Sequence, residues 1–148
     1  MKIWKSLRPG DIFLDIPCQD KEAVLRFIAD MYAENNVAED ATSIYNGLRD
    51  REETMSTGVG GGVAFPHTAS RGAVNVTVLL LRPLEPVEFD SLDGRPVDII
   101  LAIIIPENKI TLHLQILAGI SRLCRNPNIL KAVRTAGDSA ELWENIRE

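Results

Sequence analysis

The chain has 148 residues, of which 45% are hydrophobic and 25% are charged, a balance typical of a folded globular protein and not of a fibrous or disordered one. At this length a single core can bury enough surface to fold without disulfides or metal ions, so we expect one domain over residues 1–148. Sixteen Lys and Arg residues against 21 Asp and Glu residues give a net charge of −5, which argues against nucleic acids and anionic membranes as partners.

The sequence also argues against insertion into a membrane. The longest apolar stretch, Val97 to Ile105, is interrupted by Asp98 and is too short to cross a bilayer, and the N-terminus lacks the apolar segment of a signal peptide. We therefore expect a cytoplasmic protein. Cys18 and Cys124 are far apart and show no metal-ligand spacing, so we expect both to be reduced and structural, although the sequence alone leaves a disulfide open.

The N-terminal third predicts a strand and two helices. Asp11 to Ile16 is expected to be a short strand, and Asp20 follows it as the N-cap of a helix. A second helix is expected to begin near Asp40 and to end around Arg51–Glu52, where the composition changes sharply. The residues that we expect to face the core are Val24, Phe27, Ile28, Met31 and Tyr32 in the first helix and Ile44, Tyr45 and Leu48 in the second.

Thr54 to Ser70 contains no charged residue and holds four of the ten glycines, so we expect it to be a functional loop. After it, Ala73 to Leu81 and the β-branched run Val97 to Ile105 are expected to be buried strands, the second of them central. Between these two we expect a short edge strand at Val87 to Phe89 and a turn at Asp90 to Gly94.

The C-terminal part is predicted to be helical. One helix is expected from about Thr111 to Arg125, a shorter one from Asn128 to Val133, and a last one that Asp138 and Glu141 begin with a capping box. Their inward-facing residues are predicted to be Leu112, Ile116, Ile120, Leu123, Leu142, Trp143 and Ile146. Strands interleaved with helices predict an α/β or α+β fold, with a mixed sheet of about four or five strands flanked by helices.

His67 is the first of only two histidines and ends the glycine-rich segment. It follows the apolar run Val63 to Phe65, so a short strand is expected to deliver it to a sheet edge. Pro66 fixes its own φ and restrains Phe65 to extended conformations, which would hold the imidazole in place. Taken alone, His67 is more simply interpreted as a surface histidine without a role.

His113 and Arg51 add further candidate groups. Taken alone, His113 near a helix start is more simply interpreted as a histidine whose ring N–H donates to a carbonyl. Arg51 at a helix end, taken alone, is a solvated residue paired with Asp50 or Glu52. Together with His67, however, they could converge at one end of the sheet.

Such a set of groups would bind a phosphoryl group. The Arg51 guanidinium matches phosphoryl oxygens, His67 could be the nucleophile, and His113 could donate a hydrogen bond to the transferred group. Glycines let backbone N–H groups approach an anion closely. The loop residues expected to line this anion site are Ser56, Thr57, Gly58 and Gly60.

Other kinds of site are disfavoured by spacing. Gly58 to Val63 lacks the third glycine of a dinucleotide fingerprint and the ending of a P-loop, and Met55 to Thr57 is not the nucleophile elbow of a serine hydrolase. Neither cysteine lies in a peptidase signature, and two histidines without a local ligand pair do not predict a catalytic zinc site. We therefore expect no metal and no cofactor.

The segment Arg51 to His67, REETMSTGVGGGVAFPH, resembles the active-site signature of the enzyme IIA proteins of the bacterial phosphoenolpyruvate-dependent phosphotransferase system, in the mannitol, fructose and nitrogen-regulatory (type 2) family. Thr111 to Leu114 resembles the second-histidine segment of that family, and Phe89 to Asp98 resembles its turn into the central strand. The resemblance covers essentially the whole chain and implies a layered sandwich like that of mannitol enzyme IIA.

The resemblance implies a phosphocarrier. His67 would accept a phosphoryl group on Nε2 from the phosphohistidine of HPr or its nitrogen-branch paralogue, with Arg51 and His113 flanking it. In the sugar branches the group passes to a IIB cysteine, whereas in the nitrogen branch phosphorylation switches a regulated target protein. Because no IIB or membrane domain follows, we expect the regulator. A fructose or mannitol enzyme IIA is one alternative, and a binding module that is never phosphorylated is another.

Overall fold

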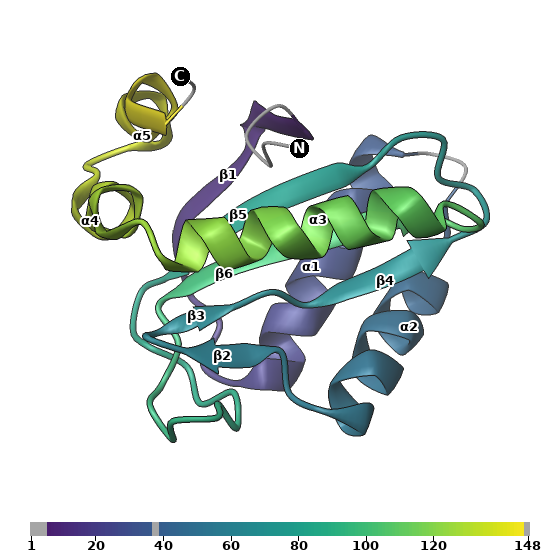
Figure 1. The fold of residues 1–148 in the computed structure, drawn as a ribbon, viewed down its shortest axis with the longest axis horizontal. Coiled ribbons are helices and arrows are strands. Elements are labelled where there is room, and N and C mark those ends of the chain that lie inside the picture. The colour runs from purple at the N-terminus through teal and green to yellow at the C-terminus, as the bar shows by residue number, and fades with distance from the viewer. Residues whose placement is uncertain (1–5, 37–38, 147–148) are drawn as a thin grey trace.

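Helices cover both faces of a mixed β-sheet in the computed structural model, which describes residues 6–36 and 39–146 (Figure 1). The predicted fold class, a mixed sheet flanked by helices, is confirmed. In chain order the described elements are β1 (Leu7–Ile16), α1 (Lys21–Asn35), α2 (Ala41–Thr54), β2 (Gly58–Gly60), β3 (Val63–Ala64), β4 (His67–Ser70), β5 (Thr77–Pro83), β6 (Ile99–Pro106), α3 (Ile110–Cys124), α4 (Pro127–Thr135) and α5 (Ser139–Ile146).

Strand β6 lies at the centre of the sheet. The strand order is β1-β5-β6-β3-β2, and β4 also pairs with β6. Strand β5 is antiparallel to β6, whereas β3 and β4 run parallel to it, one after the other along the same edge. All eight residues of β6 are buried, which confirms that the β-branched run predicted there is the central strand.

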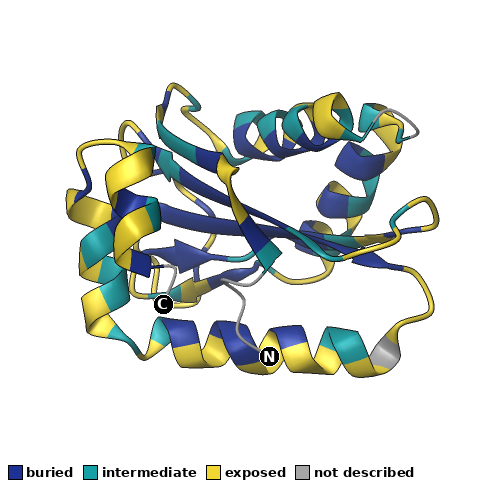
Figure 2. Ribbon diagram, turned by 90° about the horizontal axis from the view of Figure 1, so that it is seen from above, coloured by how far each residue is buried: buried dark blue, intermediate teal, exposed yellow. Residues whose placement is uncertain are grey.

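The side chains of β6 alternate between two hydrophobic cores because successive residues of a strand point to opposite faces. Helices α1 and α2 pack on one face, where the β6 residues are Ile100, Ala102 and Ile104. Helices α3, α4 and α5 pack on the other, where the β6 residues are Ile99, Leu101, Ile103 and Ile105. Figure 2 shows the buried sheet between these two helical layers.

The predicted helix caps are present. Asp20 and Asp40 cap α1 and α2, since each side chain accepts a backbone N–H of the first turn, at 2.7 and 3.1 Å. Asp138 caps α5 by accepting the N–H of Glu141 at 2.8 Å. Glu141 in turn accepts the N–H of Gly137 and not that of Asp138, so the capping box is displaced by one residue.

The segment predicted to be a functional loop contains three short strands, β2, β3 and β4, so the described sheet has six strands. Residues 61–62 form the turn between β2 and β3, and Gly60, Gly61 and Gly62 all have positive φ. Strands β3 and β4 form because β6 supplies their hydrogen-bonding partners, and β2 pairs with β3. A partner as distant in sequence as β6 leaves no local signal.

Several element boundaries also differ from the prediction. Strand β1 begins at Leu7, four residues before the expected start, and β5 begins at Thr77 instead of Ala73. The expected edge strand at Val87 to Phe89 is wrong, because Val87 makes only an isolated bridge to Val97. Helix α2 continues to Thr54, beyond its predicted end, and the N–H of its C-cap residue Met55 still donates to the carbonyl of Arg51.

The two cysteines are free thiols, as expected for reduced structural residues. Burial raises the pKa of both thiols, and the Asp20 carboxylate raises that of Cys18 further. None of the helices in residues 6–36 and 39–146 is both long and apolar enough to cross a membrane.

Candidate functional site

His67 is the first residue of β4, at the point where the chain resumes pairing with β6. Its Cα lies opposite Ile103, and the carbonyl of Pro66 accepts the Ile103 N–H at 3.0 Å. Because Pro66 has no N–H to donate, it separates β3 from β4 while both continue along one edge of β6. The residue is only 6% exposed. The expected delivery of His67 to a sheet edge by a short strand is confirmed.

The His67 ring has one defined orientation. Its Nδ1 lies 3.0 Å from the carbonyl oxygen of Phe65, and a carbonyl can only accept a hydrogen bond, so Nδ1 carries the proton. In the neutral ring Nε2 then holds a free lone pair. The Phe65 ring stacks on the imidazole at a centroid distance of 5.6 Å and an interplanar angle of 11°.

His113 lies in the first turn of α3, and its ring meets that of His67. The two ring centroids are 5.6 Å apart and the planes are inclined at 82°, an edge-to-face arrangement. The N-cap residue of α3, Lys109, makes no side-chain capping bond, and the positive end of the helix dipole lies at this terminus. The half-buried ring of His113 and the N-terminus of α3 therefore lie beside the His67 ring.

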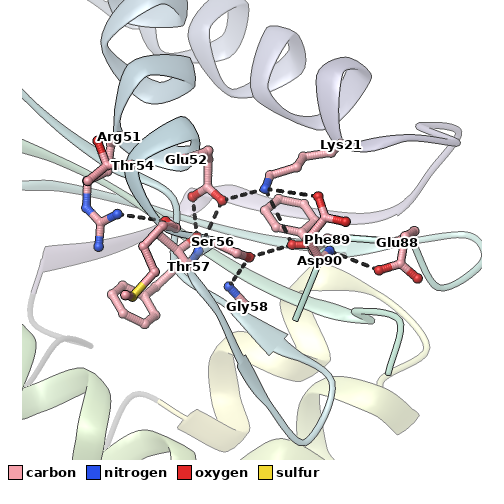
Figure 3. A network of polar contacts seen from close by, with 12 residues as sticks. Lys21, Arg51, Glu52, Thr54, Ser56, Thr57, Gly58, Glu88, Phe89 and Asp90 are labelled. Carbon is pink, nitrogen blue, oxygen red and sulfur yellow. Dashed lines mark hydrogen bonds and ion pairs between the residues drawn. The ribbon is translucent and has the colours of Figure 1, made fainter. Parts of the chain in front are cut away.

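Arg51 lies in the last turn of α2 and completes the group. Its Nη1 donates to the carbonyl of Met55 at 2.8 Å, which fixes the guanidinium beyond the helix end (Figure 3). The positive charge of Arg51 acts on the His67 ring and lowers its pKa. The structure therefore brings His113 against His67 and places Arg51 close enough for its charge to act on the His67 ring, although the three residues come from three different elements.

The pKa of His67 lies below the ordinary value of 6.5, first because burial disfavours the charged ring. The charges of Arg51 and His113 lower this pKa further, while the Phe65 carbonyl and the Glu52 carboxylate oppose the shift. The lowered pKa favours the neutral form of the imidazole, which is the nucleophilic form.

We expect an NMR titration of the ring carbons to give His67 a pKa below 6.5, and Arg51→Ala to raise it, because the variant removes a positive charge that opposes protonation. Arg49→Ala is the matched control, since Arg49 is an exposed arginine of the same helix that pairs with Asp50 and Glu53. A His67 pKa that rises equally in both variants would show that Arg51 has no specific effect on the ring.

The polar groups of Ser56, Thr57 and Gly58 already have partners. The carboxylate of Glu52 accepts both the N–H and the hydroxyl of Thr57, and Ser56 Oγ accepts the N–H of Gly58 at 3.0 Å (Figure 3). The expectation that these residues offer free N–H groups to an anion is therefore wrong for Thr57 and Gly58, because the side chains of Glu52 and Ser56 already accept those N–H groups.

Gly60 lies far from the histidines. The glycine turn leads into Val63, which pairs with Ile99 of β6, whereas His67 pairs with Ile103. At roughly 3.3 Å per residue, these two positions on β6 are about 13 Å apart. The turn is instead held by side chains. Arg134 donates to the carbonyl of Gly61 at 2.6 Å, and a Cβ on Gly62 would meet Asp98 and Arg134 at 2.6 and 2.7 Å.

Glu52 and Lys21 are the site residues that sequence reasoning missed. Glu52 is buried at the end of α2, and Lys21 Nζ lies 2.9 Å from its Oε1 (Figure 3). One signal was available, because Glu52 is four residues after Leu48 and so continues the buried face of a helix. A charged residue on that face indicates a specific partner.

Known proteins have sequences and folds similar to those of this chain. Residues 5–148 match the family described as phosphoenolpyruvate-dependent sugar phosphotransferase system, EIIA 2. The chain is 31% identical to a nitrogen regulatory protein of Pseudomonas aeruginosa, over 99% of this chain and 95% of that protein. It is 32% identical to the fructose-specific EIIA component of Haloferax volcanii, over 93% of this chain and 89% of that protein.

The crystal structure of the nitrogen regulatory protein IIA-Ntr from Neisseria meningitidis has the same fold, with a TM-score of 0.88 and 28% sequence identity. The match covers 96% of this chain and 97% of the other. The resemblance seen in the sequence is thus confirmed by the family match and by the fold. The chain belongs to the EIIA type 2 family of the phosphoenolpyruvate-dependent phosphotransferase system.

Proposed function

We propose that this protein is a histidine phosphocarrier that accepts a phosphoryl group on Nε2 of His67. The observation that carries the proposal is the bond from His67 Nδ1 to the Phe65 carbonyl, because it leaves Nε2 as the ring nitrogen with a free lone pair. Burial lowers the pKa of His67 and so favours the form in which this lone pair is unprotonated. The donor would be the phosphohistidine of HPr or of its nitrogen-branch paralogue.

The transfer step needs no proton acceptor. Nε2 attacks the phosphorus in line, the new P–N bond forms as the P–N bond of the donor breaks, and the electron pair of the broken bond returns to the donor imidazole. His67 keeps its Nδ1 proton on the Phe65 carbonyl throughout. The protein's contribution is therefore to position the ring and to stabilise the phosphoryl oxygens.

Arg51 and His113 supply that stabilisation in this scheme. The Arg51 guanidinium is held at the end of α2 by the Met55 carbonyl, and its remaining N–H groups can bind phosphoryl oxygens. His113 stands edge-on to His67 at the start of α3, where its ring N–H and the helix dipole both favour negative charge. A phosphoryl group on His67 would thus lie between a cation and a helix N-terminus.

Exposed apolar side chains on the same elements as the site suit a protein partner. Met55 directly follows α2 and is 62% exposed, and Leu114 on α3 is 64% exposed beside His113. Such residues can be covered by a partner without burying unpaired charges. We propose that HPr or its paralogue docks here, and that a IIB domain or a regulated target uses the same surface, in the cytoplasm.

We favour a nitrogen-type regulatory role over sugar relay. The support is that the relative aligned over 99% of this chain and the solved structure with a TM-score of 0.88 both carry a nitrogen regulatory name. Sugar relay is the second candidate, because the fructose-specific relative is as similar in sequence. In the regulatory role the charge added by the phosphoryl group changes the binding of a target protein. In sugar relay the phosphoryl group passes to a IIB cysteine.

We expect incubation with labelled phospho-HPr, or with its phosphorylated nitrogen-branch paralogue, to give one phosphoryl group per chain that is stable in base and labile in acid. Absence of labelling by both donors would reject the phosphocarrier and favour a binding module. Adding purified IIB domains to the labelled protein then separates the two candidate roles. Retention of the label supports regulation, and rapid loss to a IIB cysteine supports sugar relay.

A further inference from the structure

Glu52 is a buried carboxylate close to His67 whose role the phosphotransfer scheme does not explain. Its side chain is only 3% exposed, and it is the residue after Arg51 on α2. A carboxylate this deeply buried is retained only where specific groups hold it, because water no longer solvates the charge. Its partners therefore indicate what it does.

Both carboxylate oxygens of Glu52 bind Thr57. Oε1 accepts the backbone N–H of Thr57 at 3.1 Å, and Oε2 accepts its hydroxyl. Thr57 is completely buried, so no solvent competes for these bonds. Two bonds from one carboxylate fix both the side chain and the peptide plane of Thr57, and thereby the direction of the chain where it leaves α2 for β2.

Thr57 in turn holds the residue that orients the reactive ring. The carbonyl of Thr57 accepts the N–H of Phe65 at 3.2 Å, and the carbonyl of Phe65 accepts Nδ1–H of His67 at 3.0 Å. A continuous path of hydrogen bonds thus runs from Glu52 through Thr57 and Phe65 to His67. Every polar link of the path comes from residues that are buried or half-buried.

Lys21 anchors the other end of this path. Its Nζ lies 2.9 Å from Glu52 Oε1, donates to the carbonyl of Phe89 at 3.4 Å and stands 5.0 Å from the centre of the Phe89 ring. Ser56 Oγ donates to the same Phe89 carbonyl (Figure 3). The start of α1, the end of α2 and the segment before β6 are therefore joined around the ion pair of the half-buried Lys21 and the buried Glu52.

We propose that Glu52 is a positioning residue for His67: by fixing Thr57 it fixes the Phe65 carbonyl, and this carbonyl selects the tautomer of His67 in which Nε2 is free to react. The assignment rests on the proposed function, since only a ring that reacts through Nε2 requires this tautomer. Lys21 neutralises the carboxylate and keeps it in place. Glu52 itself contacts no phosphoryl group.

The test measures the ring ¹⁵N chemical shifts of His67, which distinguish the two neutral tautomers, together with the rate of labelling by phospho-HPr. In Glu52→Gln we expect the Nε2–H form to increase severalfold and the labelling rate to fall by about tenfold to a hundredfold, since a small misplacement of a reacting group has effects of this size. Glu53→Gln is the matched control, because it makes the same change at the next residue, whose side chain is exposed.

Two substitutions of Thr57 test the same path without altering a charge. Thr57→Val removes the hydroxyl bond to Glu52 and is expected to change the tautomer ratio in the same direction as Glu52→Gln. Thr57→Ser keeps both donors and is expected to retain the wild-type ratio and rate. The proposal is overturned if both Glu52→Gln and Thr57→Val keep the tautomer ratio of Glu53→Gln. If the wild-type protein accepts no phosphoryl group, the proposed function fails, and the ¹⁵N shifts still decide whether Glu52 positions the ring.

Discussion

His67→Gln is expected to abolish acid-labile labelling by phospho-HPr completely, because the variant lacks the only nitrogen to which the proposed transfer attaches phosphorus. Gln has a similar size, so the contact with Phe65 and the packing against β6 change little. The far-ultraviolet spectrum and the melting temperature are therefore expected to stay close to those of the wild type. The measurement is the amount of radioactive phosphate retained per chain at alkaline pH.

His113→Gln is the matched control for this experiment. The chain has only two histidines, so an acid-labile phosphohistidine must lie on one or the other. We expect His113→Gln to remain labelled, with an altered rate of transfer, since His113 flanks the phosphoryl group and does not bond to it. Labelling that survives in His67→Gln and disappears in His113→Gln would show that His113, and not His67, carries the phosphoryl group, and would contradict our scheme.

Arg51→Ala is expected to slow phosphoryl transfer to His67 by about a hundredfold to a thousandfold, the effect typical of removing one preorganised donor from a developing negative charge. The guanidinium is the only permanent positive charge among the three predicted site side chains. Its hydrogen bond to Met55 is exposed to solvent, so stability is expected to change by less than about 1 kcal/mol. Single-turnover transfer from phospho-HPr, followed by rapid quench, measures the rate.

Two further variants separate charge from geometry at this position. Arg51→Lys keeps the charge but loses the planar fork, so we expect an intermediate rate. Arg49→Ala removes an exposed arginine of the same helix, whose contacts are with Asp50, Glu53 and the Tyr45 ring, and should transfer at the wild-type rate. A large fall in the melting temperature of Arg51→Ala with unchanged transfer would contradict the role of Arg51.

The sequence predicted those parts of the fold whose signals are local. Asp20 and Asp40 begin helices because a short acidic side chain satisfies free N–H groups wherever it precedes a helix. The run that forms β6 is apolar at every position because both faces are buried. Both signals can be recognised within a short window of sequence.

The parts that were missed depend on distant partners. Strands β3 and β4 are short and contain or adjoin glycine and proline, and only their pairing with β6 makes them strands. The expected edge strand at Val87 to Phe89 has alternating buried residues, but among residues 6–36 and 39–146 it forms only an isolated bridge, from Val87 to Val97. Periodicity indicates which side chains face a core, whereas hydrogen-bonding partners are set by the fold.

The candidate site shows the same division. Arg51, His67 and His113 were predicted as a group, because together their residue types suit phosphoryl chemistry and the segment Arg51 to His67 resembles a known signature. The predicted anion loop was less accurate because the sequence does not show that Glu52 already binds Thr57. Backbone N–H groups that look free in a glycine-rich segment can be used by a side chain from the preceding helix.

The contact between His67 and the Phe65 carbonyl has a consequence for both directions of transfer. It uses the ring nitrogen that takes no part in the proposed bond to phosphorus, so loading and unloading would not require the imidazole to flip. In the proposed phosphocarrier the empty and loaded forms would therefore differ in charge but not in ring orientation. Transfer would then involve no rearrangement of the ring, and its rate would depend on how often the donor and acceptor proteins meet it.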